Sequence, residues 1–181
     1  MSELKVYSDQ QPGSVLEYCS NPADIAASLK IAGVRFEQWQ AGAAVKAGDD
    51  SDKVLAVYDS DVQRLVADEG YQTVDVISLN ASNPDKEALR NKFLSEHTHT
   101  EDEVRFFVDG QGLFSLHIDG KVYEVLCQKG DLISVPANTP HWFDMGPKPS
   151  LVAIRFFNNQ EGWVAHYTGS DIAEHYSRLE N

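Results

Sequence analysis

The chain has only two cysteines, Cys19 and Cys127, among its 181 residues. Two cysteines are too few for a disulfide-stabilised scaffold, so a reduced, cytoplasmic setting is the expected one. Basic residues are also scarce, since 15 Lys and Arg stand against 28 Asp and Glu and the formal net charge is −13. We therefore expect no charge-driven binding to nucleic acid or to anionic membrane surfaces.

Long apolar runs are absent as well. The run LVAI ends at Arg155, far short of the ~18 apolar residues that a membrane-spanning helix needs. The first ten residues, MSELKVYSDQ, have no basic region followed by an apolar stretch, so no secretory signal is predicted. The composition is that of a globular protein, with 42% hydrophobic and 24% charged residues, and the length fits one domain with a sizeable core.

The first 95 residues predict a mixed α/β region. Helices are indicated by apolar residues at helical spacing, by Asn-Pro pairs typical of a cap followed by a first-turn proline, and by glycines at the helix ends. The expected elements are a helix from Asn21-Pro22 to Gly33, a strand over 34–39, a helix over 54–69 capped by Gly70, a strand over 74–79, and a helix opening at Asn83-Pro84.

The pattern changes near residue 97, where short runs of β-branched and aromatic residues begin to alternate with turn residues. EVRFFV and LFSLHI are read as separate strands joined by the turn DGQG, and Asp119-Gly120 is a strong hairpin signal. Regularly spaced short strands predict an antiparallel sandwich or barrel, in which inward-facing residues can converge. The polar C-terminal residues indicate a short helix or a frayed tail.

Three histidines and one glutamate are candidate metal ligands: His97, His99 and Glu103 in HTHTEDE, and His141 in VPANTPHWF. The first three positions differ by even numbers, so a continuous β-strand would place their side chains on one face. A helix would separate residues 97 and 99 by roughly 200°. Three imidazoles and a carboxylate suit Fe, Ni, Co, Mn or Zn, and they leave two adjacent positions of an octahedral ion open for a bidentate substrate.

Arg105 falls on the same predicted face as these ligands. A buried arginine is costly unless it is paired, so Arg105 either pairs with an acid such as Glu103 or holds an anionic oxygen of a substrate. We favour the second role. Aromatic residues near the ligands can form an apolar wall for the rest of the substrate, and the candidates are Phe93, Phe107, Phe143 and Trp163.

Glu96 and Asp102 lie beside the ligands in sequence but off the predicted strand face. They are either solvated acids near a turn or acids that contact a ligand imidazole, which would orient the ring and raise its basicity. The other histidines, His117, His166 and His175, have no partners at a defined spacing and are not expected to bind metal.

Around these residues the sequence resembles the cupin superfamily. HTHTEDEVRFFVDG, with Gly110 seven residues after Glu103, is similar to the first cupin motif, and GDLISVPANTPH is similar to the second. Asn138 stands where the second motif has a glycine, a departure that does not touch the ligands. A closer resemblance, over nearly the whole chain, is to the acireductone dioxygenases of methionine salvage. It rests on the runs NPDKEALRNKFLSEHTHTEDEVRFFVDGQGLF, VPANTPHWFDMG and GVRFEQW.

The resemblance implies a mainly β fold with α additions, a cupin jelly-roll barrel whose helices come mostly from the N-terminal part. It implies a single cupin-type domain over 1–181, comprising a mixed α/β part (1–95), a metal-binding barrel core (96–165) and a C-terminal tail (166–181). It also implies a cytoplasmic monomer with one Fe2+ or Ni2+, held by His97, His99, Glu103 and His141.

The activity implied by the resemblance is the cleavage of acireductone, 1,2-dihydroxy-3-keto-5-methylthiopentene, by O2. The Fe2+ form is expected to give 2-keto-4-methylthiobutyrate and formate, and the Ni2+ form 3-(methylthio)propionate, formate and CO. Arg105 would help to hold or generate the dianionic enediol. Glu96 would assist metal incorporation, and Asp102 would relay local conformational change.

Two other functions stay open. The chain could be another metal-dependent cupin enzyme, either an isomerase or a dioxygenase for a different enediol, and activity without oxygen on a tightly bound zinc would indicate the isomerase. It could also be a non-catalytic cupin that binds a metal or a ligand, which a closed coordination sphere without an exchangeable water would indicate.

Overall fold

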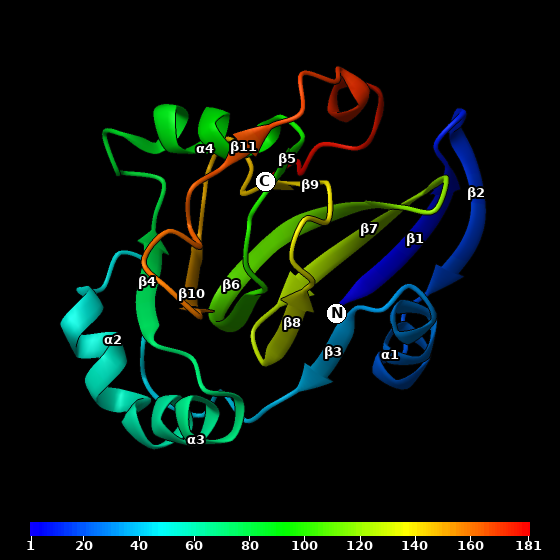
Figure 1. Cartoon of the computed structure of the whole chain (residues 1–181). Helices are drawn as coiled ribbons and strands as arrows, with labels where there is room; N and C mark the ends of the chain where they lie inside the picture. The colour runs from blue at the N-terminus through cyan, green and yellow to red at the C-terminus, as the bar shows by residue number, and fades with distance from the viewer.

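The computed structural model describes residues 1–181, which form two antiparallel sheets that share the long strand β6 (Figure 1). One sheet has the order β11-β5-β9-β6-β7-β1-β2, and the other has the order β4-β10-β6-β8-β3. The strands are β1 Glu3–Ser8, β2 Gln11–Cys19, β3 Arg35–Gln38, β4 Thr73–Leu79, β5 His97–Thr98, β6 Glu103–Ile118, β7 Lys121–Gln128, β8 Asp131–Val135, β9 His141–Asp144, β10 Leu151–Phe157 and β11 His166–Tyr167. The predicted mainly β barrel is confirmed.

Strand β6 belongs to both sheets because it bends near its middle. Its first half pairs with β8 and β10, and its second half pairs with β7 and β9. Gly110 lies at the bend with a φ of 69°, and a Cβ at this position would lie 1.8 Å from the carbonyl oxygen of Ser150. The prediction of a turn at DGQG is therefore wrong, since a glycine that permits close approach lets one strand cross between sheets.

The turn between β6 and β7 is the one that the pair Asp119-Gly120 predicts. Asp119 and Gly120 have φ values of 49° and 74°, and they connect β6 to β7 as a two-residue hairpin. Positive φ at both central residues matches the twist of the paired strands. The hairpin prediction is confirmed.

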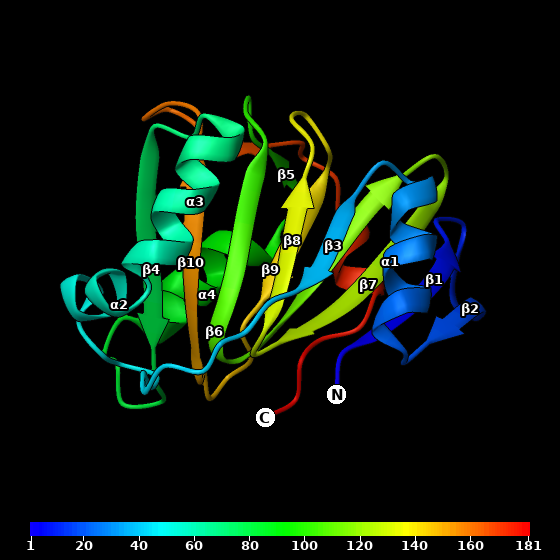
Figure 2. The same cartoon turned by 90° about the horizontal axis from the view of Figure 1, so that it is seen from below.

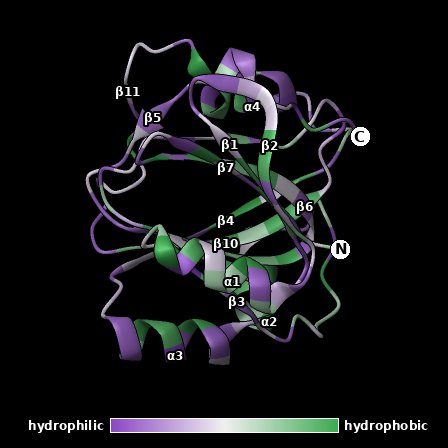
Figure 3. Cartoon of the chain, turned by 90° about the vertical axis from the view of Figure 1, so that its right-hand side faces the viewer, coloured by the Kyte–Doolittle hydropathy of each residue, from purple (hydrophilic) through white to green (hydrophobic).

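The helices are α1 Pro22–Ile31, α2 Ser51–Val57, α3 Asp59–Glu69 and α4 Lys86–Leu94, with a short 3-10 helix, η1, at Ile172–His175. Helix α3 runs beside β10 and β6 (Figure 2), and apolar residues alternate with polar ones along it (Figure 3). A cluster of 13 buried residues joins α2 and α3 to one face of β6 and β10, including Val62, Leu65 and Phe106. A second cluster of 20 buried residues, with Phe107, Phe114 and Phe143, fills the space between the sheets.

Two expectations for the N-terminal half need correction. The predicted helix over 54–69 is broken at Tyr58, whose φ and ψ of −102° and 18° end α2 and begin α3 in a new direction. Residues 3–19, for which the sequence indicated no strand, form β1 and β2, and β1 pairs with β7 along its whole length. The other predicted elements of this half, α1, β3, β4 and α4, are present.

Strands from the first 95 residues are hydrogen-bonded to strands from the later part of the chain. Thus β1 pairs with β7, β3 with β8, and β4 with β10. The division into an N-terminal part, a barrel core and a tail stays a prediction. None of the helices has the length and apolar character needed to cross a membrane.

Candidate metal centre

The structure brings the four predicted ligands together at one end of the barrel. His97 is the first residue of β5, His141 begins β9, and Glu103 begins β6. His97 and His141 are paired across neighbouring strands, and their ring centroids lie 4.5 Å apart. The His99 ring is 5.1 Å from that of His97 and 5.2 Å from that of His141. All four side chains are buried.

The single strand predicted over 97–103 is wrong, although the convergence holds. Strand β5 ends at Thr98, residues 99–102 form a loop, and β6 begins at Glu103. His99 therefore reaches the site from the loop, where its backbone carbonyl accepts a hydrogen bond from the amide of Asn138. The ligands meet because residues 99–102 carry the chain from β5 on one side of β9 to β6 on the other, and strand alternation is not the cause.

Backbone carbonyls fix the orientation of every imidazole. The Nδ1 atom of His97 lies 2.7 Å from the carbonyl oxygen of Ser95, and that of His141 lies 2.8 Å from the carbonyl oxygen of Thr139. The Nδ1 atom of His99 lies 2.9 Å from the carbonyl oxygen of Val164. Since a carbonyl only accepts, each Nδ1 carries the proton, and each Nε2 presents a lone pair.

These Nε2 atoms converge on one point without a hydrogen-bond partner. The three lie within 4.8 Å of one another, and all are buried. Burial and the nearby His141 lower the pKa of His97 from 6.5 to about 3, so this imidazole is neutral at physiological pH. Buried unpaired acceptors are costly, and neutral imidazole nitrogens are the ligands that divalent first-row metals prefer. The residues present therefore fit a metal ion.

Glu103 completes the group. Its Oε2 atom lies 3.0 Å from Nε2 of His99 and 3.6 Å from Nε2 of His141, and it has no hydrogen-bond partner. Its other oxygen accepts a hydrogen bond from Nε of Arg105. Burial opposes ionisation, but the charge of Arg105 holds the pKa of Glu103 well below its usual value. A carboxylate anion thus faces the same point as the imidazoles.

Arg105 is buried among aromatic rings. Its guanidinium carbon lies 4.5 Å from the centroid of Phe143, 4.7 Å from that of Phe114 and 5.7 Å from that of Phe93. Burial lowers the pKa of Arg105 and the charge of Glu103 opposes this effect, yet a guanidinium remains protonated in proteins. Its Nη1 atom is buried and has no hydrogen-bond partner. A donor of fixed positive charge is therefore free beside the imidazole cluster.

The four aromatic candidates do not form one wall. Phe93, Phe107 and Phe143 lie together, with ring centroids 6.5 Å apart for Phe93 and Phe143 and 6.3 Å apart for Phe107 and Phe143. Trp163 lies apart from them, 43% exposed, with its ring against Phe157. Sequence reasoning missed Phe114, which touches both Arg105 and His141 from the second half of β6, because nothing near the motifs points to it.

A cavity of about 530 Å3 lies next to this cluster and is lined by Lys92, Arg155, Trp163, Val164, Ala165 and Tyr167. Val164 accepts the hydrogen bond from His99, and Tyr167 is paired with His97 between β11 and β5. Arg155 is paired with Arg105 between β10 and β6. Two residues that line the cavity, Val164 and Tyr167, therefore contact the side chains of His99 and His97.

Neither acidic neighbour contacts a ligand imidazole, so that interpretation of Glu96 and Asp102 is wrong. One oxygen of Glu96 lies 2.8 Å from Nδ1 of His117, and the other accepts a hydrogen bond from the hydroxyl of Thr168. Asp102 accepts a hydrogen bond from the backbone amide of Ala137. The Nδ1 atoms of the three imidazoles are hydrogen-bonded to backbone carbonyls instead. Glu96 and Asp102 connect the segments around the site through His117, Thr168 and Ala137.

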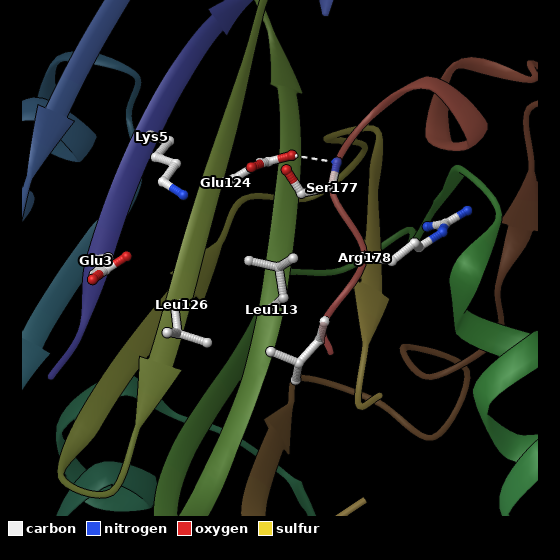
Figure 4. Close-up of a pocket in the computed structure, with 8 residues that line it drawn as sticks. Glu3, Lys5, Leu113, Glu124, Leu126, Ser177 and Arg178 are labelled. Atoms are coloured by element: carbon white, nitrogen blue, oxygen red, sulfur yellow. Dashed lines mark hydrogen bonds between the residues drawn. The ribbon is translucent and has the colours of Figure 1, made fainter. Parts of the chain in front are cut away.

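The far end of β9 is anchored by a buried acid. Asp144 accepts two hydrogen bonds from Arg90 of α4, at 2.7 and 3.0 Å, and one from the amide of Leu179 in the tail. The tail also donates from the amide of Ser177 to Glu124, beside a smaller cavity of about 150 Å3 (Figure 4). The tail and α4 thereby fix the strand that carries His141.

The sequence matches the model of one protein family. The model of the ARD/ARD' family matches residues 3–165. The chain belongs to the ARD/ARD' family. An acireductone dioxygenase from Alcanivorax borkumensis is 64% identical over 178 residues, covering 98% of each chain. The acireductone dioxygenase from Klebsiella oxytoca is 56% identical over 179 residues, covering 99% of each chain.

Solved structures of the ARD/ARD' family include an acireductone dioxygenase from Bacillus anthracis with a cadmium ion in its active centre. It is 34% identical, superposes with a TM-score of 0.78, and covers 92% of this chain and 98% of its own. Membership of the ARD/ARD' family makes this chain a dioxygenase with a cupin fold and a three-histidine metal-binding site. The predicted family, fold and enzyme class are confirmed.

Proposed function

We propose that the chain cleaves acireductone with O2 in methionine salvage, and that it uses one Fe2+ or Ni2+ held by His97, His99, Glu103 and His141. The observation that carries the proposal is the convergence of three partnerless imidazole Nε2 atoms beside the partnerless Nη1 of Arg105. The names of close relatives support the substrate. The Fe2+ form would give 2-keto-4-methylthiobutyrate and formate, and the Ni2+ form 3-(methylthio)propionate, formate and CO.

The bound metal supplies Lewis acidity and a template for a chelating enediolate. The chain supplies four donors whose directions are already set, since each Nδ1 is bound to a carbonyl and Oε1 of Glu103 to Arg105. Donors fixed in this way need no reorganisation when the ion binds. A six-coordinate ion held by these four residues would keep two positions for the two oxygens of the substrate.

Arg105 binds an anionic oxygen of the substrate through Nη1. The guanidinium keeps its charge, so it acts by stabilising the ionised enediol and not by accepting its proton. Phe93, Phe114 and Phe143 surround the guanidinium and exclude water, which strengthens its attraction for an anion. The positive charge therefore favours the dianion over the neutral enediol.

The methylthio end of the substrate lies in the cavity that Trp163 lines. Trp163 and Val164 supply apolar surface there, and thioethers make favourable contacts with aromatic rings. Phe93, Phe107 and Phe143 are not among the residues that line this cavity. They contribute by packing around Arg105, so direct contact of these three rings with the substrate stays a prediction.

The monomeric state and the cytoplasmic location belong to the same proposal. The formal net charge of −13 favours solubility and disfavours binding to nucleic acid and anionic surfaces. The roles of Glu96 in metal incorporation and of Asp102 in relaying conformational change rest on the resemblance alone. Glu96 contacts His117 and Thr168, and Asp102 accepts a hydrogen bond from Ala137, so both acids bind segments next to the site.

Oxygen uptake with acireductone tests the reaction. The metal-loaded protein is mixed with acireductone in air and under argon, and His141→Ala serves as the control. We expect one O2 consumed for each substrate in air, no conversion under argon, and only the uncatalysed rate with the variant. Conversion under argon would instead identify a cupin isomerase. A folded, metal-loaded protein that reacts no faster than the uncatalysed rate in air would indicate an enzyme for a different enediol or a binding protein.

A further inference from the structure

Lys92 lies at the mouth of the cavity beside the metal centre, and its positive charge is not neutralised. It is the only lysine among the cavity-lining residues, it is exposed, and it forms no salt bridge, since the only lysine ion pair of the structure joins Lys53 to Asp49. Arg155, the other cation of the cavity, is paired with both carboxylate oxygens of Asp75. The net positive charge of the cavity mouth is therefore carried by Lys92.

The cavity differs in charge from the rest of the molecule. No aspartate or glutamate is among its six lining residues, although acids outnumber bases by 28 to 15 in the chain. Four other cavities each include an acid: Glu124, Asp61, Glu37 and Glu87 respectively. A cation without an acidic neighbour, on a protein of net charge −13, creates a local site where an anion is attracted and not repelled.

Lys92 and Arg105 both lie near the ring of Phe93. Its Nζ atom lies 5.8 Å from the centroid of Phe93, and the guanidinium carbon of Arg105 lies 5.7 Å from the same centroid. Its backbone carbonyl accepts a hydrogen bond from the hydroxyl of Tyr167, which is paired with His97. Helix α4 and β11 lie at the same end of the barrel (Figure 1). Lys92 is thus linked to the metal centre through Phe93 and Tyr167.

We propose that Lys92 attracts the anionic substrate into the cavity and toward Arg105. The inference rests on the proposed function, since it requires an enediolate as substrate. An exposed cation acts through solvent, so it raises the local concentration of the anion without taking part in bond breaking. It should therefore act on kcat/KM, and its effect should vanish when salt screens it.

The test compares metal-loaded variants in which one charge is altered. Lys92→Gln removes the charge, Lys92→Glu reverses it, and Lys92→Arg keeps it. Lys86→Gln is the matched control, because Lys86 is a half-buried lysine of the same helix that lines a different cavity. Oxygen uptake gives kcat and KM, and anaerobic titration with acireductone gives its Kd. The kinetic constants and the Kd are measured from about 0.01 M to about 1 M salt, over which the Debye length falls from ~30 Å to ~3 Å.

We expect Lys92→Gln to lower kcat/KM about threefold to tenfold at low salt, with Lys92→Glu lower still. Lys92→Arg should match the wild type, kcat should stay within about twofold, and the differences should disappear at high salt. If Lys92→Gln behaves like Lys86→Gln at every salt concentration, attraction by Lys92 is refuted while the proposed function stands. If the wild type itself consumes no oxygen with acireductone, both proposals fall.

Discussion

Glu103 and Arg105, two residues apart on β6, form a buried ion pair in which Nε of the arginine donates to Oε1 of the glutamate at 2.5 Å. Both side chains are only 1% exposed. The pair leaves one carboxylate oxygen facing the imidazoles and one guanidinium nitrogen, Nη1, without a protein partner. A single strand therefore presents a carboxylate oxygen and a guanidinium N–H donor with their mutual geometry fixed.

Replacing Arg105 should separate metal binding from turnover. We expect Arg105→Ala and Arg105→Lys to retain metal, because none of the four ligands is removed, and to lose at least about 100-fold in kcat/KM. Lysine has a single point donor and cannot replace a forked guanidinium that serves Glu103 and the substrate together. Without metal, Arg105→Ala should also lose about 3–5 kcal/mol of stability relative to the metal-free wild type, since Glu103 is then left buried and unpaired. Turnover equal to that of the wild type would assign Arg105 a purely structural role.

Removing one imidazole should empty the metal centre. In His97→Ala and His141→Ala the coordination shell is broken, so metal content measured by elemental analysis should fall to background. Chelation of the wild-type metal should lower stability by about 4 kcal/mol if the ion had been present at 1,000 times its Kd. His175→Ala, which alters an exposed residue, is the control. Full metal occupancy in either site variant would show that the ion binds elsewhere.

His117 should make stability depend on pH. Burial opposes its protonation, but Asp9 and Glu96 outweigh this effect and raise the pKa of His117 above 6.5. Its stabilising contribution is therefore fully present below pH 6.5, the unfolded value, and is lost as the pH rises through the higher folded pKa. The stability advantage of wild type over His117→Gln should be larger at about pH 5.5 than at about pH 9.

Chemical denaturation of both proteins at the two pH values measures this difference. His166→Gln, which changes an exposed histidine, serves as the control and should show no pH-dependent difference from the wild type. An advantage over His117→Gln that stays constant or grows toward pH 9 would mean that the imidazole does not bridge Asp9 and Glu96 as a cation.

The two cysteines should be dispensable for catalysis. Burial raises the pKa of the Cys127 thiol well above its usual value, so no thiolate forms there, and this side chain belongs to the apolar cluster between the sheets. Cys127→Ala should lose about 1–2 kcal/mol of stability and keep its activity. A thiol reagent should label Cys19 alone in the folded protein and both residues after unfolding. Loss of activity in folded Cys19→Ala,Cys127→Ala would reveal a thiol function.

The grouping of the candidate ligands could be predicted from their residue types and their nearness in the sequence. His97, His99 and Glu103 lie within seven residues of one another, and His141 follows later in the chain. Together they supply three imidazoles and one carboxylate, which form a typical ligand set for a divalent first-row metal. The continuous strand was nevertheless wrong, since residues 99–102 form a loop that positions His99 through Asn138. The choice of ligand types is encoded locally, whereas the path of the loop depends on contacts from a distant segment.

Long-range partners explain the other differences. Strand β2 is mostly exposed and is held by its pairing with β1, so its sequence carries no alternation of buried and exposed residues. Phe114 reaches Arg105 only because β6 bends at Gly110 and crosses to the other sheet. The carbonyl of Val164 orients His99 across 65 positions of the sequence. None of these contacts leaves a periodic signal that a single sequence displays.

Product analysis after anaerobic reconstitution tests the proposed reaction most directly. Apoprotein is loaded separately with Fe2+ and Ni2+, its metal content is measured, and each form is mixed with acireductone and O2. We expect formate and 2-keto-4-methylthiobutyrate from the iron form, and formate, CO and 3-(methylthio)propionate from the nickel form. Oxygen uptake no faster than the uncatalysed rate in both folded, metal-loaded forms would contradict the assignment of acireductone as the substrate of this metal centre.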